Sequence, residues 1–463
     1  MTWLQRYWLQ HYATSAIWIA PLGAVAVALA AVRVLHWIEA DLGWEAKLNP
    51  ETARAVLTTL AASMFTFVVF VSSALLVAVQ LASAQLTPRI VAIVFKDPVT
   101  KLSLTFFVLS FTFTLGALIR IKESVPLLTA QVAAYSCLSS LAVFLFLLDH
   151  VGKTLTAGGA LRLLGRLGRS VIVHIYPRRL SEIPDSTQTS GTLSAPAART
   201  ITSSKDGTVL AFDVCGLVSL ARRADCVIQL APQVGDFIAT GDPLFRIHGG
   251  GETLTSTELY QSVAIGHERT MEQDPAYVFR IMVDIASKAL SPAINDPTSA
   301  VLAIDQIHHL LRNVGSRYLD EGQVRDAKGQ LRLIYRTPDW EDFVHLAITE
   351  IRQFGAQSIQ INRRLRAMLE NLIQTVPQER AKLLRQELNI LRRSAQRFFT
   401  EPEDRALADV SDLQGVGGKH GHSQAVGQSQ PASSHAAADT PGVDALLAPS
   451  QSPPVNGGHH HDR

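Results

Sequence analysis

Residues 57–82 read LTTLAASMFTFVVFVSSALLVAVQLA, and no Asp, Glu, Lys or Arg occurs between Arg54 and Arg89. A helix needs about 20 consecutive apolar residues to cross the hydrocarbon core of a bilayer. Three similar runs lie nearby, so that the full set of windows is 13–34, 57–82, 102–121 and 126–148. Together they predict an α-helical integral membrane domain of four spans over residues 1–150.

The positive-inside rule orients these spans. The segment between spans two and three carries Arg89, Lys96 and Lys101 against Asp97, and more basic residues follow span four. Acids dominate between spans one and two: Glu39, Asp41, Glu45 and Glu51. We therefore expect the N terminus and everything after residue 150 to be cytoplasmic. Signal-peptide cleavage near Ala28-Leu29-Ala30 is the alternative, but the length of the apolar run favours an uncleaved anchor.

Hydroxyl side chains are the main polar groups inside the predicted spans, because ionisable residues are absent from their middles. That absence argues against a proton-coupled transporter. Ser103, Ser110 and Thr114 share one helical face of span three. Two interpretations remain open. These residues face a pore, or they hydrogen-bond between packed helices, which is the commoner role of such groups.

The composition and the motifs exclude several classes of function. The chain has 42 Lys and Arg residues and 40 Asp and Glu residues, which gives a net charge of +2. Such a small net charge does not attract nucleic acid electrostatically. Three scattered cysteines make no disulfide framework. The sequence also lacks a nucleophile elbow, a P-loop, an HExxH motif, paired-Cys zinc spacing and a dinucleotide fingerprint. We expect no enzyme, cofactor, metal or nucleic-acid partner, and a lipid bilayer as the surroundings.

Residues 151–200 form a basic juxtamembrane segment and linker. Arg162, Arg166 and Arg169 alternate with leucines. This pattern fits either a basic amphipathic stretch at the inner membrane surface or a plain linker with inside-positive charge.

Residues 201–250 are strand-like, with short apolar runs between turn residues. Residues 234–244, VGDFIATGDPL, resemble the half-barrel of lipoyl and biotinyl carriers, with Gly235 and Gly241 where tight turns need positive φ. The carriers also need a modifiable lysine, and none occurs between Lys205 and Lys288. The resemblance implies a small lipoyl/biotinyl-like β-barrel without a swinging arm.

The densest polar constellation surrounds an expected helix at 276–290, within a mainly helical region at 251–415. Arg280, Asp284 and Lys288 recur at i, i+4 and i+8, as in an exposed charge ladder. Asp274-Pro275 and Asp296-Pro297 fit helix starts, with Asp as N-cap and Pro at N1. That structural explanation competes with a polar pocket for an ion, headgroup or other anion, lined by Asp274, Arg280, Asp284, Lys288, Asn295 and Asp296.

Further elements complete the C-terminal part. Periodicity predicts helices at 298–314, 337–371 and 377–399 and a strand at 331–336. Residues 416–463 are rich in Gly, Ser, Ala, Pro and Gln and predict a disordered tail. The predicted fold is thus four spans followed by an α+β cytoplasmic domain that contains a helical bundle.

Four patches together resemble a bacterial family of predicted membrane proteins known as domain of unknown function 2254. They are residues 80–89 (QLASAQLTPR), 274–297 with its SPAINDP core, 338–343 (PDWEDF) and 412–418 (DLQGVGG). Thr87 stands where the family has Ser, a departure that keeps the hydroxyl. The resemblance covers nearly all of the chain except the tail. It implies a four-span protein of the bacterial inner membrane, and it brings no established activity.

Two functions follow as hypotheses. The first is a homo-oligomeric channel or conduit, lined by hydroxyls of the spans and gated by the cytoplasmic domain. The second is a membrane-anchored sensor or scaffold, whose cytoplasmic domain binds an ion, a small ligand or a protein partner. Four spans exceed what anchoring needs, which favours the conduit.

Overall fold

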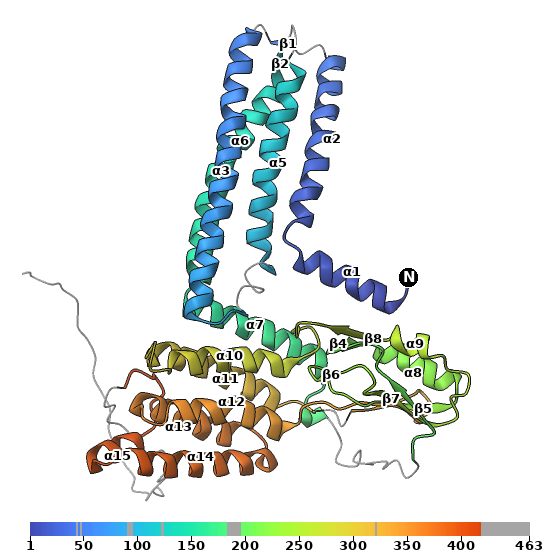
Figure 1. The fold of residues 1–463 in the computed structure, drawn as a ribbon. Coiled ribbons are helices and arrows are strands. Elements are labelled where there is room, and N and C mark those ends of the chain that lie inside the picture. Colours follow the sequence, from blue (N-terminus) through green and yellow to red (C-terminus); the bar gives the residue numbers. More distant parts are fainter. Residues whose placement is uncertain are drawn as a thin grey trace, which may run out of the picture. The chain divides into compact units, whose positions relative to one another are not determined.

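The computed structural model describes residues 1–42, 45–46, 49–89, 96–121, 125–182, 196–319 and 322–417. Its long apolar helices confirm the four candidate membrane spans: α2 (Ile19–Leu42), α3 (Pro50–Gln85), α5 (Pro98–Arg120) and α6 (Leu127–Thr154). These helices run alongside one another in Figure 1, and α5 contacts each of the other three.

Local capping explains where two of the spans begin. The Asn49 side chain accepts a hydrogen bond from the Glu51 backbone N–H at 2.9 Å, at the start of α3. The Asp97 carboxylate likewise accepts one from the Thr100 N–H at 2.9 Å, at the start of α5. In both helices a proline follows the cap, where its fixed φ suits the first turn.

A separate helix, α1 (Trp3–Ser15), precedes the first span. The sequence pattern placed the start of that span at residue 13, but the chain leaves the helix at Ala16 and re-enters one at Ile19. One face of α1 packs onto a β-sheet, in a cluster formed by Trp3, Leu4, Tyr7, Trp8, Leu210, Ala211 and Ala264. Helix α1 therefore connects the first span to that sheet.

The strands between residues 199 and 334 form two open sheets. The five-stranded sheet has the order β3 (Arg199–Thr202), β7 (Pro243–Gly249), β5 (Cys226–Leu230), β10 (Leu331–Ile334), β9 (Gln323–Arg325). The three-stranded sheet has the order β6 (Phe237–Ile238), β4 (Gly207–Phe212), β8 (Val263–Gly266). A short ladder also joins β1 (Glu45–Ala46) to β2 (Val125–Pro126). Helices α8 (Val214–Arg223) and α9 (Ser256–Tyr260) lie between strands in the chain.

The prediction of a lipoyl/biotinyl-like barrel at 201–250 is wrong. Gly235 and Gly241 do take positive φ, 95° and 94°, so the local turns were predicted correctly. The strands around them, however, belong to different sheets, and β5 pairs in parallel with β10, about a hundred residues later in the chain. Local turn chemistry sets the turns, whereas strand partners are chosen by long-range packing. Strands from both sides of residue 250 thus share one sheet.

A group of helices after the fourth span packs together, and we call this group the helical domain. Its members are α7 (Ala157–Ile175), α10 (Pro275–Ala289), α11 (Pro297–Gly315), α12 (Trp340–Phe354), α13 (Ile359–Thr375), α14 (Gln378–Phe398) and α15 (Pro402–Ala408). Apart from the peripheral α15, they share one apolar core, which also includes Ala82 and Leu86 from the C-terminal end of α3. A short 3-10 helix, η1 (Leu180–Glu182), follows α7.

These helices confirm the predicted ones at 276–290, 298–314 and 377–399, with one difference elsewhere. The single helix predicted over 337–371 is two helices, α12 and α13, because the chain turns between Gly355 and Ser358. Of the predicted disordered tail 416–463, all but the first two residues lies outside the described residues.

Candidate functional site

The end of α3 meets helix α10 through polar contacts. Lys288 Nζ donates to the Ser83 carbonyl oxygen at 3.3 Å, and Arg89 forms an ion pair with Asp284. Two guanidinium groups contact the Tyr277 ring, with Cζ atoms 5.9 Å (Arg89) and 5.4 Å (Arg269) from its centroid. We call Ser83, Arg89, Tyr277, Asp284 and Lys288 the α3–α10 joint.

Arg280 extends this joint to helix α12. Its Nε donates to Asp284 Oδ1 at 2.6 Å, and its two terminal nitrogens reach Glu350 Oε1 and Oε2 at 2.5 and 2.6 Å. Such bidentate, charge-assisted pairing is strong and directional. The Arg280 guanidinium holds the pKa of the Glu350 carboxyl below its usual value. The i,i+4 pair of the expected ladder, Arg280–Asp284, is present, but it is not an exposed pair, because the Arg280 side chain is 28% exposed and bridges α10 and α12.

Three of the predicted pocket residues have local roles. Asp274 caps α10 by accepting from the Tyr277 N–H at 2.9 Å, and it also forms an ion pair with Arg269. Burial raises the pKa of Asp274 in spite of that partner. Asp296 caps α11 through the Ser299 N–H at 3.1 Å, and Asn295 occupies a left-handed turn with φ of 48°. The structure thus places Asp284 and Lys288 in the joint, with Arg280 bound to Asp284, and it assigns capping or turn roles to Asp274, Asn295 and Asp296.

The hydroxyls of span three, for which a pore and helix packing were both open, are buried between helices. Ser110 Oγ donates to the Ser136 carbonyl of α6 at 3.3 Å, and Thr114 Oγ1 donates to the Ser110 carbonyl at 2.7 Å. The Thr114 hydroxyl also lies 3.2 Å from Cys137 Sγ. Ser103 is buried as well. Within one copy of the chain, these groups serve helix packing.

A second polar contact joins three segments that are far apart in sequence. The carboxylate of Glu272, just before α10, lies 3.0 Å from His11 Nδ1 of α1 and 3.9 Å from Lys96 Nζ at the start of the third span. Sequence reasoning missed this contact and the partners Arg89 and Glu350. The signal was present, because Arg89 and Glu272 both stand in or beside polar motifs, but their pairing is a property of the fold.

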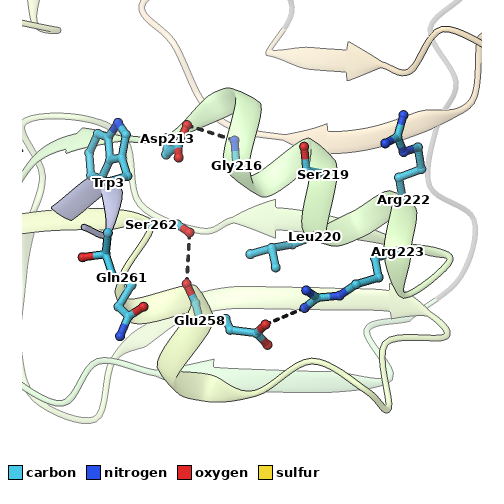
Figure 2. A pocket seen from close by; sticks show the side chains of 11 residues that line it. Trp3, Asp213, Gly216, Ser219, Leu220, Arg222, Arg223, Glu258, Gln261 and Ser262 are labelled. Carbon is cyan, nitrogen blue, oxygen red and sulfur yellow. Dashed lines mark hydrogen bonds and ion pairs between the residues drawn. The ribbon is translucent and has the colours of Figure 1, made fainter. Parts of the chain in front are cut away.

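The protein surface also has two hollows, which lie apart from the joint. The first hollow lies between α1, α8 and α9 and has a volume of about 680 Å³. Figure 2 shows its side chains: Arg223 pairs with Glu258 at 2.5 Å, and Asp213 accepts a hydrogen bond from the Gly216 N–H at 2.9 Å. Trp3 of α1 forms part of its wall. A second hollow, of about 570 Å³ on α3, is lined by Ala62, Ser63, Thr66, Phe67 and Phe70. Among the described residues, no cluster of three or more His, Cys, Asp or Glu side chains is placed to hold a metal.

Comparison with known proteins identifies the family. The family described as "Predicted membrane protein (DUF2254)" matches residues 14–371. The chain belongs to this family. Uncharacterized proteins of Mycobacterium bovis and Mycobacterium tuberculosis are each 26% identical to it over 415 residues, which cover 86% of this chain and 79% of each relative. No solved structure gives a significant match.

The matched region of this DUF2254 protein includes every residue of the α3–α10 joint and Glu350. The motif at 412–418 lies beyond it, and its role is visible in the structure. The buried Asp412 carboxylate accepts backbone N–H groups of Gln414, Gly415 and Gly417 at 3.0, 2.9 and 2.7 Å. Two side chains of α13 hold the described end of the DUF2254 chain: Gln360 donates to the Gly415 carbonyl oxygen at 2.6 Å, and Arg363 donates to that of Gly417 at 2.9 Å.

Proposed function

We propose that this protein is a non-enzymatic transducer of the bacterial cytoplasmic membrane, with both termini in the cytoplasm. Its cytoplasmic part senses an ion, a small ligand or a protein partner and passes the change to the spans. One observation carries the proposal: a chain of charged contacts, Arg89–Asp284–Arg280–Glu350, links the end of span two to α10 and α12. The burial of Ser103, Ser110 and Thr114 in helix packing favours this function over a conduit within one chain.

Coupling through the joint can be tested at a distance. Replacing Glu350→Gln removes the far end of the charged chain without touching α3. We expect amide hydrogen exchange at residues 82–89 to rise several-fold, because opening of the end of α3 becomes easier when its support loosens. Hydrogen–deuterium exchange read by mass spectrometry on the full-length protein measures this directly.

The matched control is Glu370→Gln, which removes the carboxylate partner of a different arginine, Arg366, on α13 and outside the charged chain. It should leave residues 82–89 unchanged. Exchange that rises around α12 alone in the Glu350 variant would show that the spans and the helical domain move independently, and the transducer proposal would fail.

A homo-oligomeric conduit is the second candidate, supported by the hollow on α3. Ser63 and Thr66 are exposed there, so an assembly of several copies would place hydroxyls of span two, and not of span three, along a shared path. Ion flux into liposomes holding the purified protein tests this. The conduit would be supported if Thr66→Val altered the ion flux and Ser110→Ala left it unchanged. The absence of ion flux with the folded wild-type protein would reject it.

A further inference from the structure

Helix α7 begins where the fourth span ends. Helix α6 ends at Thr154 and α7 starts at Ala157, with Thr156 capping it through the Gly159 N–H at 3.1 Å. From Thr154 to Ala157 the chain makes three Cα–Cα steps, which reach at most about 11 Å. The first turn of α7 therefore lies within about 11 Å of the end of α6.

One face of α7 is committed to the protein interior. Its buried residues are Ala160, Leu161, Leu164, Gly168 and Ile172, and they pack against α10 and α11. The apolar side of this stretch therefore lies inside the protein. The face opposite the core is the one left for an outside partner.

That opposite face is basic. Arg162, Arg166 and Arg169 are all exposed, and at 100° per residue they fall within about 60° of one another, on the side away from the buried residues. No Asp or Glu occurs between Asp149 and Glu182. Within the described part of the chain, none of the three arginines forms an ion pair. We call these three residues the arginine ridge.

We propose that the arginine ridge binds the headgroups of anionic phospholipids in the leaflet where span four ends. Guanidinium groups pair with phosphate oxygens in bidentate fashion, and basic residues beside a span are attracted to an anionic surface. The position of α7, directly after α6, brings this charge to the bilayer and not to bulk solvent. The lipid then holds α7, and through it α10 and α11, against the membrane.

Spin-label EPR tests the assignment on the full-length protein in phosphatidylcholine bilayers. The probes are spin-labelled phosphatidylglycerol and spin-labelled phosphatidylcholine, whose relative association with the protein is measured. The triple variant Arg162→Gln, Arg166→Gln, Arg169→Gln should lose preference for phosphatidylglycerol by at least about fivefold, the factor for one surface arginine. The control is Arg385→Gln, Arg393→Gln, Arg397→Gln, which removes the same charge from exposed positions on α14 and should change nothing.

Salt gives a second measurement that needs no variant. Raising NaCl from about 0.05 M to about 0.5 M should weaken the wild-type preference, because headgroup contacts are screened. A wild-type protein without any preference for phosphatidylglycerol at low salt would overturn the proposal. The arginine ridge would then be a binding surface for an acidic protein. Equal losses in the α7 and α14 triple variants would overturn it as well.

Discussion

At the scale of single residues, one device recurs along the chain: an aspartate that caps a helix and stands just before its first turn. Asp97, Asp274 and Asp296 each precede a proline and accept a backbone N–H from the first turn. The carboxylate satisfies a backbone donor that the helix leaves unpaired, and its charge favours the positive end of the helix dipole. Two of these aspartates were also candidates for a ligand pocket, and their geometry explains them without a ligand.

The capping role of Asp296 predicts a specific pair of results. Asp296→Ala should lower the free energy of unfolding by about 1 kcal/mol. Asp296→Asn should change that free energy little, because asparagine caps a helix about as well as aspartate does. Thermal or denaturant unfolding of the detergent-solubilised protein, followed by circular dichroism, measures both. A large loss in the asparagine variant would mean that the charge itself has a role that capping does not explain.

At the scale of elements, α7 depends on close packing against two helices. A Cβ added at Gly168 would lie 2.7 Å from Val278 Cγ1 and 3.0 Å from Leu310 Cδ1. Real Cβ atoms do not approach so closely, so the glycine lets α7 sit against α10 and α11. The glycine-rich sequence of α7, which favours a linker by helix propensity alone, is therefore compatible with a buried helix.

This contact predicts opposite effects for two glycines. Gly168→Ala should destabilise the protein by about 1–3 kcal/mol, as overpacking does in a tight core. Gly152→Ala is the control, since nothing lies within 4 Å of its added Cβ, and alanine there should be neutral or stabilising by up to about 1 kcal/mol. Melting temperatures of the two variants decide the matter. Equal melting temperatures would show that α7 has room to shift away from its neighbours.

At the scale of the whole molecule, three segments near the membrane converge on the helical domain. They are α1, through Glu272, the end of α3, through the joint, and α7, which follows α6 directly. Each contact joins a span to the helical domain by a different route. The transducer proposal requires such contacts, because through them a change in the helical domain would reach several spans at once.

The proposed topology predicts how the cysteines react. Cys215 on α8 is exposed, whereas Cys226 is buried. A membrane-impermeant maleimide should therefore label Cys215 in inside-out vesicles and leave it unlabelled in intact cells, because the proposed topology places α8 in the cytoplasm. An added cysteine at the exposed Asp41, at the far end of α2, should show the reverse pattern. Labelling of Cys215 from outside intact cells would invert the topology.

Parts of the candidate site were visible in the sequence and parts were not. The caps at Asp274 and Asp296 were predicted, because a cap depends on residues within one turn. The role of Arg280 was not, because its decisive partner, Glu350, lies 70 residues later in the chain. The same limit applies to the hydroxyls of α5, whose common face was predicted but whose burial against Ser136 was left open.

The sequence by itself determined the four candidate spans, the capped helix starts at Pro275 and Pro297 and the positive φ of Gly235 and Gly241, because hydropathy and capping act over a few neighbouring residues. Only the tertiary structure decided that β5 pairs with β10, that the apolar face of α7 enters the protein core, and that Arg89 meets Asp284. Such choices compare the packing of distant segments, and a local pattern of residues is compatible with more than one of them.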